Sequence, residues 1–286
     1  MNKVYACIDG QTNTHAVMDW SAWAALRLDL PLEFLHVLER HPETSATLDL
    51  SGAIGLGAQE SILQGLGESD AQHSKAARQV GRELLTQARV RAAAAGVALL
   101  DGRLRHGEFV PTVQEMEPDA RLFVLGEHYH AAHSSKVHLD HRVEQVIRGT
   151  RRSVLVATRA QFTPPARFAV AFDGSASAFK TIEAVKASTL LSGMSVRLFM
   201  AGVESPQRLR LLEEARQALA TAGFDVMAQF LKGEPHVVLP ALALQQDVHL
   251  LVMGAFGHSW LRQLVSGSTT STLLRVSDVP VLVLRE

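Results

Sequence analysis

Three glycines and a run of hydroxyl side chains stand close together near the end of the 286-residue chain. Gly254 and Gly257 are separated by two residues, and nine more lead to Gly267, which is followed by Ser268, Thr269, Thr270 and Ser271. Because glycine has no Cβ, its backbone N–H groups can approach an anion closely. Hydroxyl residues that start a helix add donors to the free N–H groups at its positive end. The spacing therefore predicts a loop that holds phosphate groups.

Two further side chains in this stretch are candidates for a phosphate contact. His258 and Arg262 lie between Gly257 and Gly267. A guanidinium suits a pair of phosphate oxygens, although a solvated position on a surface loop is the alternative for both residues. No side chain nearby is an evident general base, so no catalytic residue is assigned.

An internal repeat indicates which elements must position this loop. Residues 4–10 (VYACIDG) and 168–174 (FAVAFDG) share an apolar strand followed by Asp-Gly and a helical pattern. Three more strand pairs recur in the same order: LEFLHV with VRLFM, RLFVLG with HLLVMG, and SVLVA with PVLVL. Such short, continuous runs rich in Val, Leu and Phe are typical of parallel strands that are buried on both faces.

Helical patterns alternate with these strands, at residues 83–95 and 207–222, and end at Gly96 and Gly223. The sequence therefore predicts an α/β fold of two tandem, doubly wound, open parallel sheets. We place the two units at residues 1–160 and 165–286, with the break near Pro164-Pro165, where the backbone must be extended. Ligands bind beyond the carboxyl ends of such strands, which is where the glycine loop falls.

Composition excludes several classes of protein. The chain is 47% hydrophobic, which is enough for two cores, and its formal net charge of −1 gives no field that would attract nucleic acid or anionic lipid. The single cysteine, Cys7, excludes an internal disulfide and a cysteine-based zinc site, and we expect it to be a buried apolar residue. No apolar run is long enough for a membrane span, so a cytoplasmic location is expected.

The first unit departs from the second at the phosphate loop. Asp9 and Gly10 are present, but Gly126 is followed by Glu127 and a set of histidines without a second glycine: His128, His130, His133, His138 and His141. These imidazoles could bind zinc or nickel, and a solvated polar loop is the alternative. A long glycine-containing insert, residues 40–73, is expected to be a loop that acts as a lid or a tolerated surface insertion.

The glycine spacing, followed by Ser or Thr, resembles that of the universal stress protein family, in which it marks the ATP-binding members. The resemblance covers the whole chain as two tandem copies, and only the second copy carries the motif. It implies an adenine nucleotide α-hydrolase-like, Rossmann-like fold. It also implies that Asp173 contacts the base or ribose and that Ala201 and Met253 line the adenine pocket. Capping of the next helix is the alternative for Asp173, and a place in the core is the alternative for the other two.

The resemblance further implies that the two units pack as a pseudo-dimer through their last strands, and that further dimerisation can occur. The expected ligand is ATP, with ADP or AMP as alternatives and Mg²⁺ as an accompanying ion. The function favoured is a nucleotide-responsive stress-response regulator with at most weak ATPase activity. A slow ATP hydrolase or nucleotidyl-transfer enzyme that uses the same pocket, with a metal or small-ligand site in the first unit, is the alternative.

Overall fold

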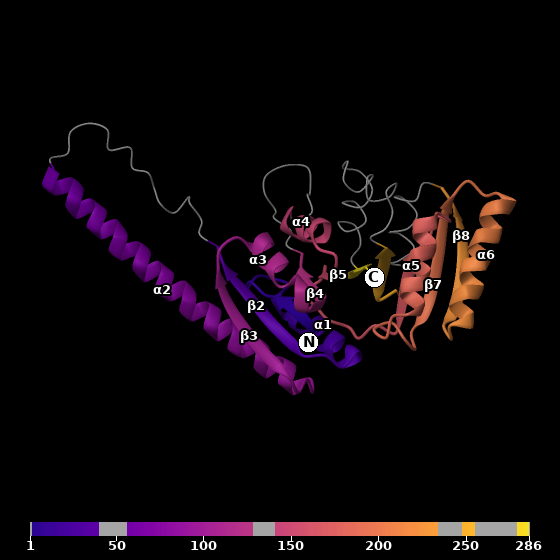
Figure 1. Ribbon diagram of the computed structural model, residues 1–286, viewed down its shortest axis with the longest axis horizontal. Coiled ribbons are helices and arrows are strands. Elements are labelled where there is room, and N and C mark those ends of the chain that lie inside the picture. Colours follow the sequence, from indigo (N-terminus) through magenta and orange to yellow (C-terminus); the bar gives the residue numbers. More distant parts are fainter. Residues whose placement is uncertain (1, 40–55, 128–140, 234–247, 255–278, 286) are drawn as a thin grey trace.

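The computed structural model describes residues 2–39, 56–127, 141–233, 248–254 and 279–285. Within these ranges the strands form one ten-stranded sheet in the order β3-β2-β1-β4-β5-β10-β9-β6-β7-β8 (Figure 1). Each half of the chain contributes five neighbouring strands. The α/β fold with mostly parallel strands that the sequence predicts is confirmed.

Within its described residues, the first half supplies five parallel strands and four α-helices. The strands are β1 (Lys3–Cys7), β2 (Leu32–Leu38), β3 (Leu100–His106), β4 (Ala120–Gly126) and β5 (Ser153–Ala157). The helices are α1 (Thr14–Leu28), α2 (Leu56–Ala94), α3 (Phe109–Glu115) and α4 (His141–Gly149), and a short 3₁₀ turn covers Glu117–Asp119. Gly96 follows α2 with a φ of 97°, as expected of a glycine that ends a helix.

The second half repeats the same strand order. Its strands are β6 (Arg167–Ala171), β7 (Ser195–Gly202), β8 (Asp225–Lys232), β9 (Leu250–Gly254) and β10 (Val281–Leu284). Its described helices are α5 (Ala176–Lys186) and α6 (Pro206–Thr221), and Gly223, with a φ of 91°, follows α6. The order β10-β9-β6-β7-β8 corresponds strand for strand to β5-β4-β1-β2-β3. The repeat in the sequence is therefore a repeat of topology.

The two halves join through their last strands. β5 and β10 pair antiparallel, with Val156 opposite Val281 and Val154 opposite Val283, whereas every other pair of neighbouring strands is parallel within the described sheet. The Arg285 backbone N–H donates to the Ser153 hydroxyl at 3.0 Å, which continues the junction past the strand ends. The Arg285 side chain donates to the Ile147 carbonyl oxygen at the end of α4, at 2.7 Å. The expected pseudo-dimer through these strands is confirmed.

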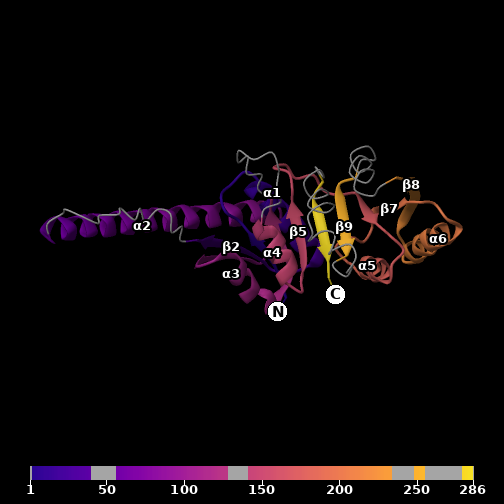
Figure 2. The same cartoon turned by 90° about the horizontal axis from the view of Figure 1, so that it is seen from above.

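Two hydrophobic cores lie on the two faces of the sheet and run through both halves. One is covered by α1, α2, α5 and α6, and the other by α3 and α4 among the described helices (Figure 2). Trp20 of α1 is 1% exposed and packs edge-to-face on Trp23 and on Phe162, with ring centroids 5.2 and 4.9 Å apart. Phe162 belongs to the connection between β5 and β6, so this contact fixes the connection to the first half. Cys7 is buried, as expected.

The helix α2 corrects the prediction for residues 40–73. Helix begins at Leu56, so the second part of the expected loop is helical, and residues 40–55 lie outside the described ranges. Each interior glycine costs a helix about 1 kcal/mol relative to alanine, and the neighbouring Ala, Leu, Gln and Glu residues are good helix formers that offset this cost. The start of α2 extends well beyond the sheet (Figures 1 and 2).

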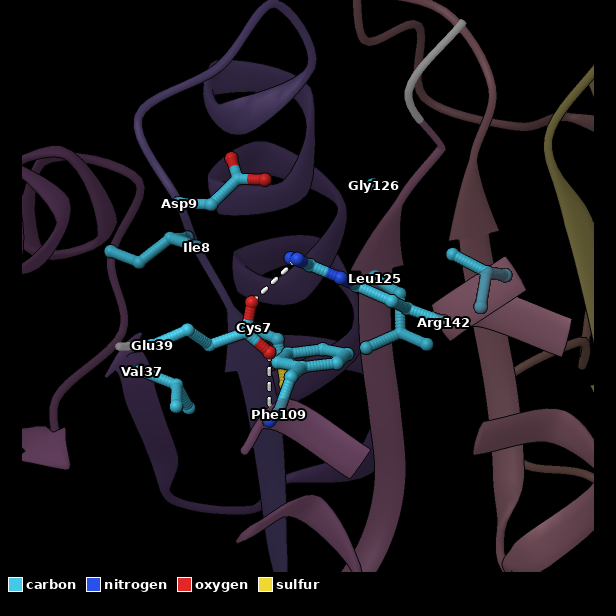
Figure 3. Close-up of a pocket in the computed structure, with 10 residues that line it drawn as sticks. Cys7, Ile8, Asp9, Val37, Glu39, Phe109, Leu125, Gly126 and Arg142 are labelled. Atoms are coloured by element: carbon cyan, nitrogen blue, oxygen red, sulfur yellow. Dashed lines mark hydrogen bonds and ion pairs between the residues drawn. The ribbon is translucent and has the colours of Figure 1, made fainter. Parts of the chain in front are cut away.

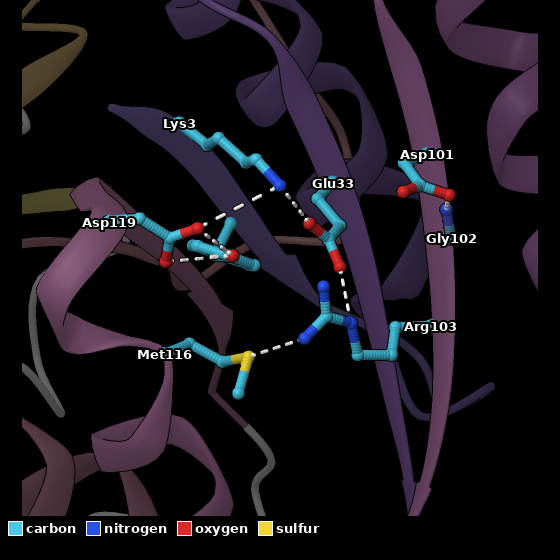
Figure 4. Close-up of polar contacts among 8 residues, drawn as sticks. Lys3, Glu33, Asp101, Gly102, Arg103, Met116 and Asp119 are labelled. Carbon is cyan, nitrogen blue, oxygen red and sulfur yellow. Dashed lines mark hydrogen bonds and ion pairs between the residues drawn. The ribbon is translucent and has the colours of Figure 1, made fainter. Parts of the chain in front are cut away.

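A row of charged side chains crosses the first half of the sheet, from β3 to the 3₁₀ turn (Figure 4). The Glu33 carboxylate of β2 is 1% exposed and lies between Lys3 Nζ at 2.8 Å and Arg103 Nε at 2.7 Å. The Tyr5 hydroxyl donates to Asp119 at 3.0 Å, and Lys3 Nζ lies 3.8 Å from the same carboxylate. A buried carboxylate needs such partners, because desolvation of an unpaired charge is costly.

Replacing Lys3 by methionine is expected to reduce the loss of the free energy of unfolding as the pH rises into the alkaline range. The hydrogen bond to Glu33 holds the pKa of Lys3 above its ordinary value of 10.5, and burial opposes this effect. The raised folded-state pKa stabilises the fold fully below pH 10.5, and this contribution is lost as the pH rises through the raised pKa. Urea unfolding should show that the wild type loses about 1 kcal/mol more than Lys3→Met above that pH.

Tyr5 also changes the stability of the fold in alkali, in the wild type and in the Lys3 variant alike. Burial raises the pKa of the Tyr5 hydroxyl, so Tyr5 also stabilises the fold at neutral pH and loses this contribution in alkali. Because Tyr5 is present in both proteins, the difference between their unfolding curves reports Lys3. An equal alkaline loss in the two proteins would show that the pair with Glu33 contributes nothing measurable.

Candidate functional site

The carboxyl ends of β9, β6 and β7 meet at one edge of the sheet. These strands are neighbours and parallel, with Phe168 of β6 opposite Leu250 of β9 and Val196 of β7. The arrangement brings together four of the residues that the sequence analysis selects, which follow or end these strands: Asp173, Ala201, Met253 and Gly254. This edge is the candidate functional site.

Asp173 shapes the turn between β6 and α5. Its Oδ1 accepts a hydrogen bond from the Ser175 backbone N–H at 2.9 Å, across Gly174, whose φ is 80°. Ser175 is the N-cap of α5 and accepts from the Ala178 N–H at 3.1 Å. The capping role considered for Asp173 therefore belongs to Ser175, which Asp173 supports. The Asp173 side chain is exposed at the strand end, where a carboxylate can accept hydrogen bonds from hydroxyl or amino groups.

Ala201 and Met253 contribute mainly backbone to this edge. They are 7% and 3% exposed, so both pack in the protein interior. The Ala201 carbonyl oxygen accepts a hydrogen bond from Arg208 Nη2 at 2.7 Å. Gly202, with a φ of 131°, makes room for that guanidinium, because a Cβ there would lie 2.9 Å from Arg208 Nη1. Their burial therefore favours the alternative that Ala201 and Met253 belong to the hydrophobic core.

Arg208 is the residue of this edge that sequence reasoning missed. It lies in the first turn of α6, and its guanidinium carbon is 5.5 Å from the centre of the Phe230 ring. A signal for it was present: Ser205-Pro206 is a strong helix start directly after β7. A side chain in the first turn of that helix must then lie near the end of β7.

Gly254 has a packing role that does not depend on any ligand. A Cβ built at this position would overlap the Thr181 hydroxyl of α5 and would lie 3.0 Å from the Thr181 Cβ. The Thr181 hydroxyl donates to the Ser177 carbonyl oxygen at 3.1 Å, which fixes the side chain against β9. The close approach of α5 to β9 thus requires glycine at this strand end.

The rest of the predicted phosphate loop lies outside the described residues. This applies to Gly257, His258, Gly267, Ser268 and Thr269, and to Arg262. The histidines at 128, 130, 133 and 138 also lie outside, and only the backbone of His141 is described, at the start of α4. Among the described side chains no group of three or more His, Cys, Asp or Glu is placed to hold a metal ion.

The corresponding edge of the first half contains a pocket at the ends of β1, β2 and β4 (Figure 3). Asp9 repeats the turn of Asp173, because its Oδ1 accepts from the Gln11 backbone N–H and from the Thr14 hydroxyl, both at 2.9 Å. Glu39 and Arg142 form an ion pair of 2.5 Å beside the pocket. The sequence analysis notes Asp9 as the counterpart in the repeat but selects neither member of this pair.

The ten-stranded sheet and the turns at its carboxyl-end edges place the chain among tandem α/β proteins of the doubly wound class. Each half has an Asp-Gly turn after its first strand. Residues 166–285 match the profile of the Universal stress protein family. The chain is 29% identical to the universal stress protein Slr1230 of Synechocystis sp. over 288 residues, which cover 100% of both chains. The whole chain is therefore similar to a universal stress protein, and its second half matches the family model.

One solved structure with a similar fold covers the whole chain. A universal stress protein from Archaeoglobus fulgidus covers 100% of this chain and 96% of its own length, with a TM-score of 0.67 and 16% identity. A universal stress protein solved in complex with cAMP covers 42% of this chain and 97% of its own, with a TM-score of 0.37 and 25% identity. In the present chain, no described helix is both long and apolar enough to cross a membrane.

Proposed function

We propose that the second half of the chain, residues 165–286, binds an adenine nucleotide, and that the protein acts as a nucleotide-responsive regulator in the cytoplasm. The observation that carries this proposal is the position of the glycine and hydroxyl loop. In the sequence it follows β9 directly. β9 pairs with β6, which leads to Asp173, and β6 pairs with β7, which carries Ala201 to the same edge. Ligands of doubly wound sheets bind at such edges.

The proposed division of roles follows from the chemistry of each group. Gly257 and Gly267 would leave room for phosphate oxygens beside backbone N–H donors, and Ser268 and Thr269 would add hydroxyl donors. Asp173 offers carboxylate oxygens to ribose hydroxyls or to an amino group of the base. ATP is the expected ligand, with ADP and AMP as alternatives, and Mg²⁺ would neutralise part of the charge of a polyphosphate. The first half, residues 1–160, lacks the loop and is not expected to bind ATP.

Purified protein should therefore bind one ATP per chain and should not turn it over repeatedly. Nucleotide extracted from the freshly purified protein is to be identified by mass spectrometry, and the stoichiometry is to be measured by calorimetry. Incubation with labelled ATP and Mg²⁺ then separates binding from hydrolysis. Steady formation of product over many turnovers would favour the alternative of a slow hydrolase, and two equivalents of bound ATP would contradict the assignment to the second half.

A further inference from the structure

The start of helix α2 leaves the body of the protein and offers a surface for interaction. The later turns of α2 (Leu56–Ala94) pack on the sheet, where Gly81, Leu85 and Ala88 are buried. The earlier turns project past the sheet (Figures 1 and 2). From its first residue to Val80 the helix spans about 37 Å, at 1.5 Å per residue.

The described side chains of this projecting part are exposed on every face of the helix. Lys75 to Val80 are six consecutive exposed residues, and Val80 is 62% exposed. A helix that packs on one neighbour buries a residue in every three or four, so the described chain covers no face of these turns. Most of the stability of a helix in a protein comes from packing of one face. A partner that covers one face would supply the burial that this part of α2 lacks.

The sequence of the projecting part has an apolar seam with the spacing of a coiled coil. Six positions alternate three and four residues apart, which places them on one side of a helix. They are occupied by Leu63, Leu66, Asp70, His73, Ala77 and Val80. Four of the six residues are apolar, and the two polar residues stand in the middle. Glu68, Lys75 and Arg78 fall outside these positions, as expected of the solvent side of an amphipathic helix.

This seam is complementary to itself when a second copy runs in the opposite direction. One register pairs Asp70 with His73, Leu66 with Ala77 and Leu63 with Val80, each residue facing its partner on the other copy. Every apolar position then meets an apolar position, and a carboxylate meets an imidazole that can donate a hydrogen bond to it. A polar pair within an apolar seam specifies the register of paired helices.

The charges of α2 favour the same direction. Residues 56–70 include three acidic and no basic residues, and residues 71–82 include three basic and no acidic residues. Antiparallel helices therefore set opposite charges side by side, whereas parallel helices would set like charges side by side. Both the seam and the charges thus match a second copy of this helix in reverse.

We propose that two copies of this chain form a homodimer in which the projecting parts of their α2 helices pack antiparallel, with Leu63 of each copy opposite Val80 of the other. The interface is isologous, as in most homodimers. The two sheets lie at opposite ends of the helix pair, because the Val80 residues of the two copies are about 25 Å apart along it. Dimer formation does not depend on the proposed binding of nucleotide.

Replacing Val80 by aspartate tests the apolar seam. Sedimentation equilibrium of the full-length protein from about 1 to 100 μM covers weak and stable dimers. The wild type should dimerise, and Val80→Asp should raise the dissociation constant at least about 30-fold, because a charge enters an apolar contact twice in each dimer. Val90→Asp is the matched control, since Val90 is 65% exposed on the same helix but lies outside the projecting part. It should change the dissociation constant by less than about twofold.

An exchange of charge across the seam tests direction and register. Leu63→Glu and Val80→Lys should each weaken the dimer, because each puts a charge opposite an apolar residue. The double variant should dimerise at least about tenfold more tightly than either single variant, because opposite charges then face each other twice. In a parallel pair each position faces its own copy, so the double variant would set like charges together and gain nothing.

Thermal unfolding verifies that each variant is folded, which is expected because Val80 and Val90 are exposed. The proposal is overturned if the wild type stays monomeric over the whole range, whether residues 40–55 of the same chain or another macromolecule covers the seam. It is also overturned if Val80→Asp weakens the dimer no more than Val90→Asp does. A double variant that dimerises no better than the single variants would likewise contradict it.

Discussion

Replacement of Gly267 by valine is expected to abolish ATP binding, with a loss of at least about 100-fold in affinity, or about 2.7 kcal/mol. The physical reason is that a branched Cβ would occupy the space that a phosphate group needs beside the backbone N–H donors. Gly257→Val should have the same effect. Calorimetric titration with ATP measures the affinity, and thermal unfolding in the absence of ligand verifies that the variant remains folded.

The control for this experiment lies in the other half of the same chain. Gly126 ends β4 as Gly254 ends β9, but no glycine loop follows it. Gly126→Ala should therefore leave ATP affinity within about twofold of the wild type, or about 0.4 kcal/mol. Full ATP affinity in folded Gly267→Val would show that the nucleotide site lies elsewhere. A large loss in Gly126→Ala would show that the first half takes part in binding.

Replacement of Gly254 by valine is the second change with a large expected effect, and this effect is on stability. The Cβ would overlap the Thr181 hydroxyl and force α5 away from β9. Overpacking of a dense interior typically costs about 1–3 kcal/mol, and a branched side chain at this distance should reach about 3 kcal/mol or more. Urea unfolding without nucleotide measures this loss independently of any ligand.

The double substitution separates packing from ligand binding. Thr181→Ala removes the hydroxyl that meets the new Cβ first, so Gly254→Val with Thr181→Ala should recover at least about 1 kcal/mol relative to the sum of the single effects. Additive effects would mean that Thr181 is not the cause of the clash. If Gly254→Val is as stable as the wild type and only loses ATP affinity, the glycine serves the nucleotide rather than the helix.

The central strands of the sheet were predictable because their sequences are continuous apolar runs. VYAC of β1 and RLFVLG of β4 must be buried on both faces, and this pattern indicates parallel strands covered by helices. The repeat of these runs showed that SVLVA corresponds to PVLVL, whereas the pairing of these two strands was implied by the resemblance to the universal stress protein family. The edge strands β3 and β8 were harder to identify because Leu100–His106 and Asp225–Lys232 mix charged and apolar residues. An edge strand has one neighbour and more solvent, so its sequence is less constrained.

The residues of the candidate site were predictable only where they belong to a local sequence pattern. Asp173 follows from an Asp-Gly turn after a buried strand, and Gly254 follows from its place at the end of β9. The contact of Arg208 with the Ala201 carbonyl depends on the angle at which α6 leaves β7, and the clash that requires Gly254 depends on how closely α5 packs. Neither distance is encoded in spacing along the chain. The ion pair of Glu39 with Arg142 joins residues about one hundred positions apart, so it too emerges only in three dimensions.

The junction of β5 with β10 limits how this chain can associate with a second copy. Each of the two strands already has a neighbour on both sides, so neither offers an open row of backbone groups to another molecule. Among the described strands, further chains could extend the sheet only at β3 or β8, where Arg103 and Arg105 or Asp225 and Lys232 discourage such pairing. We therefore expect a homodimer to use helices or loops, which would leave the internal symmetry of each chain intact.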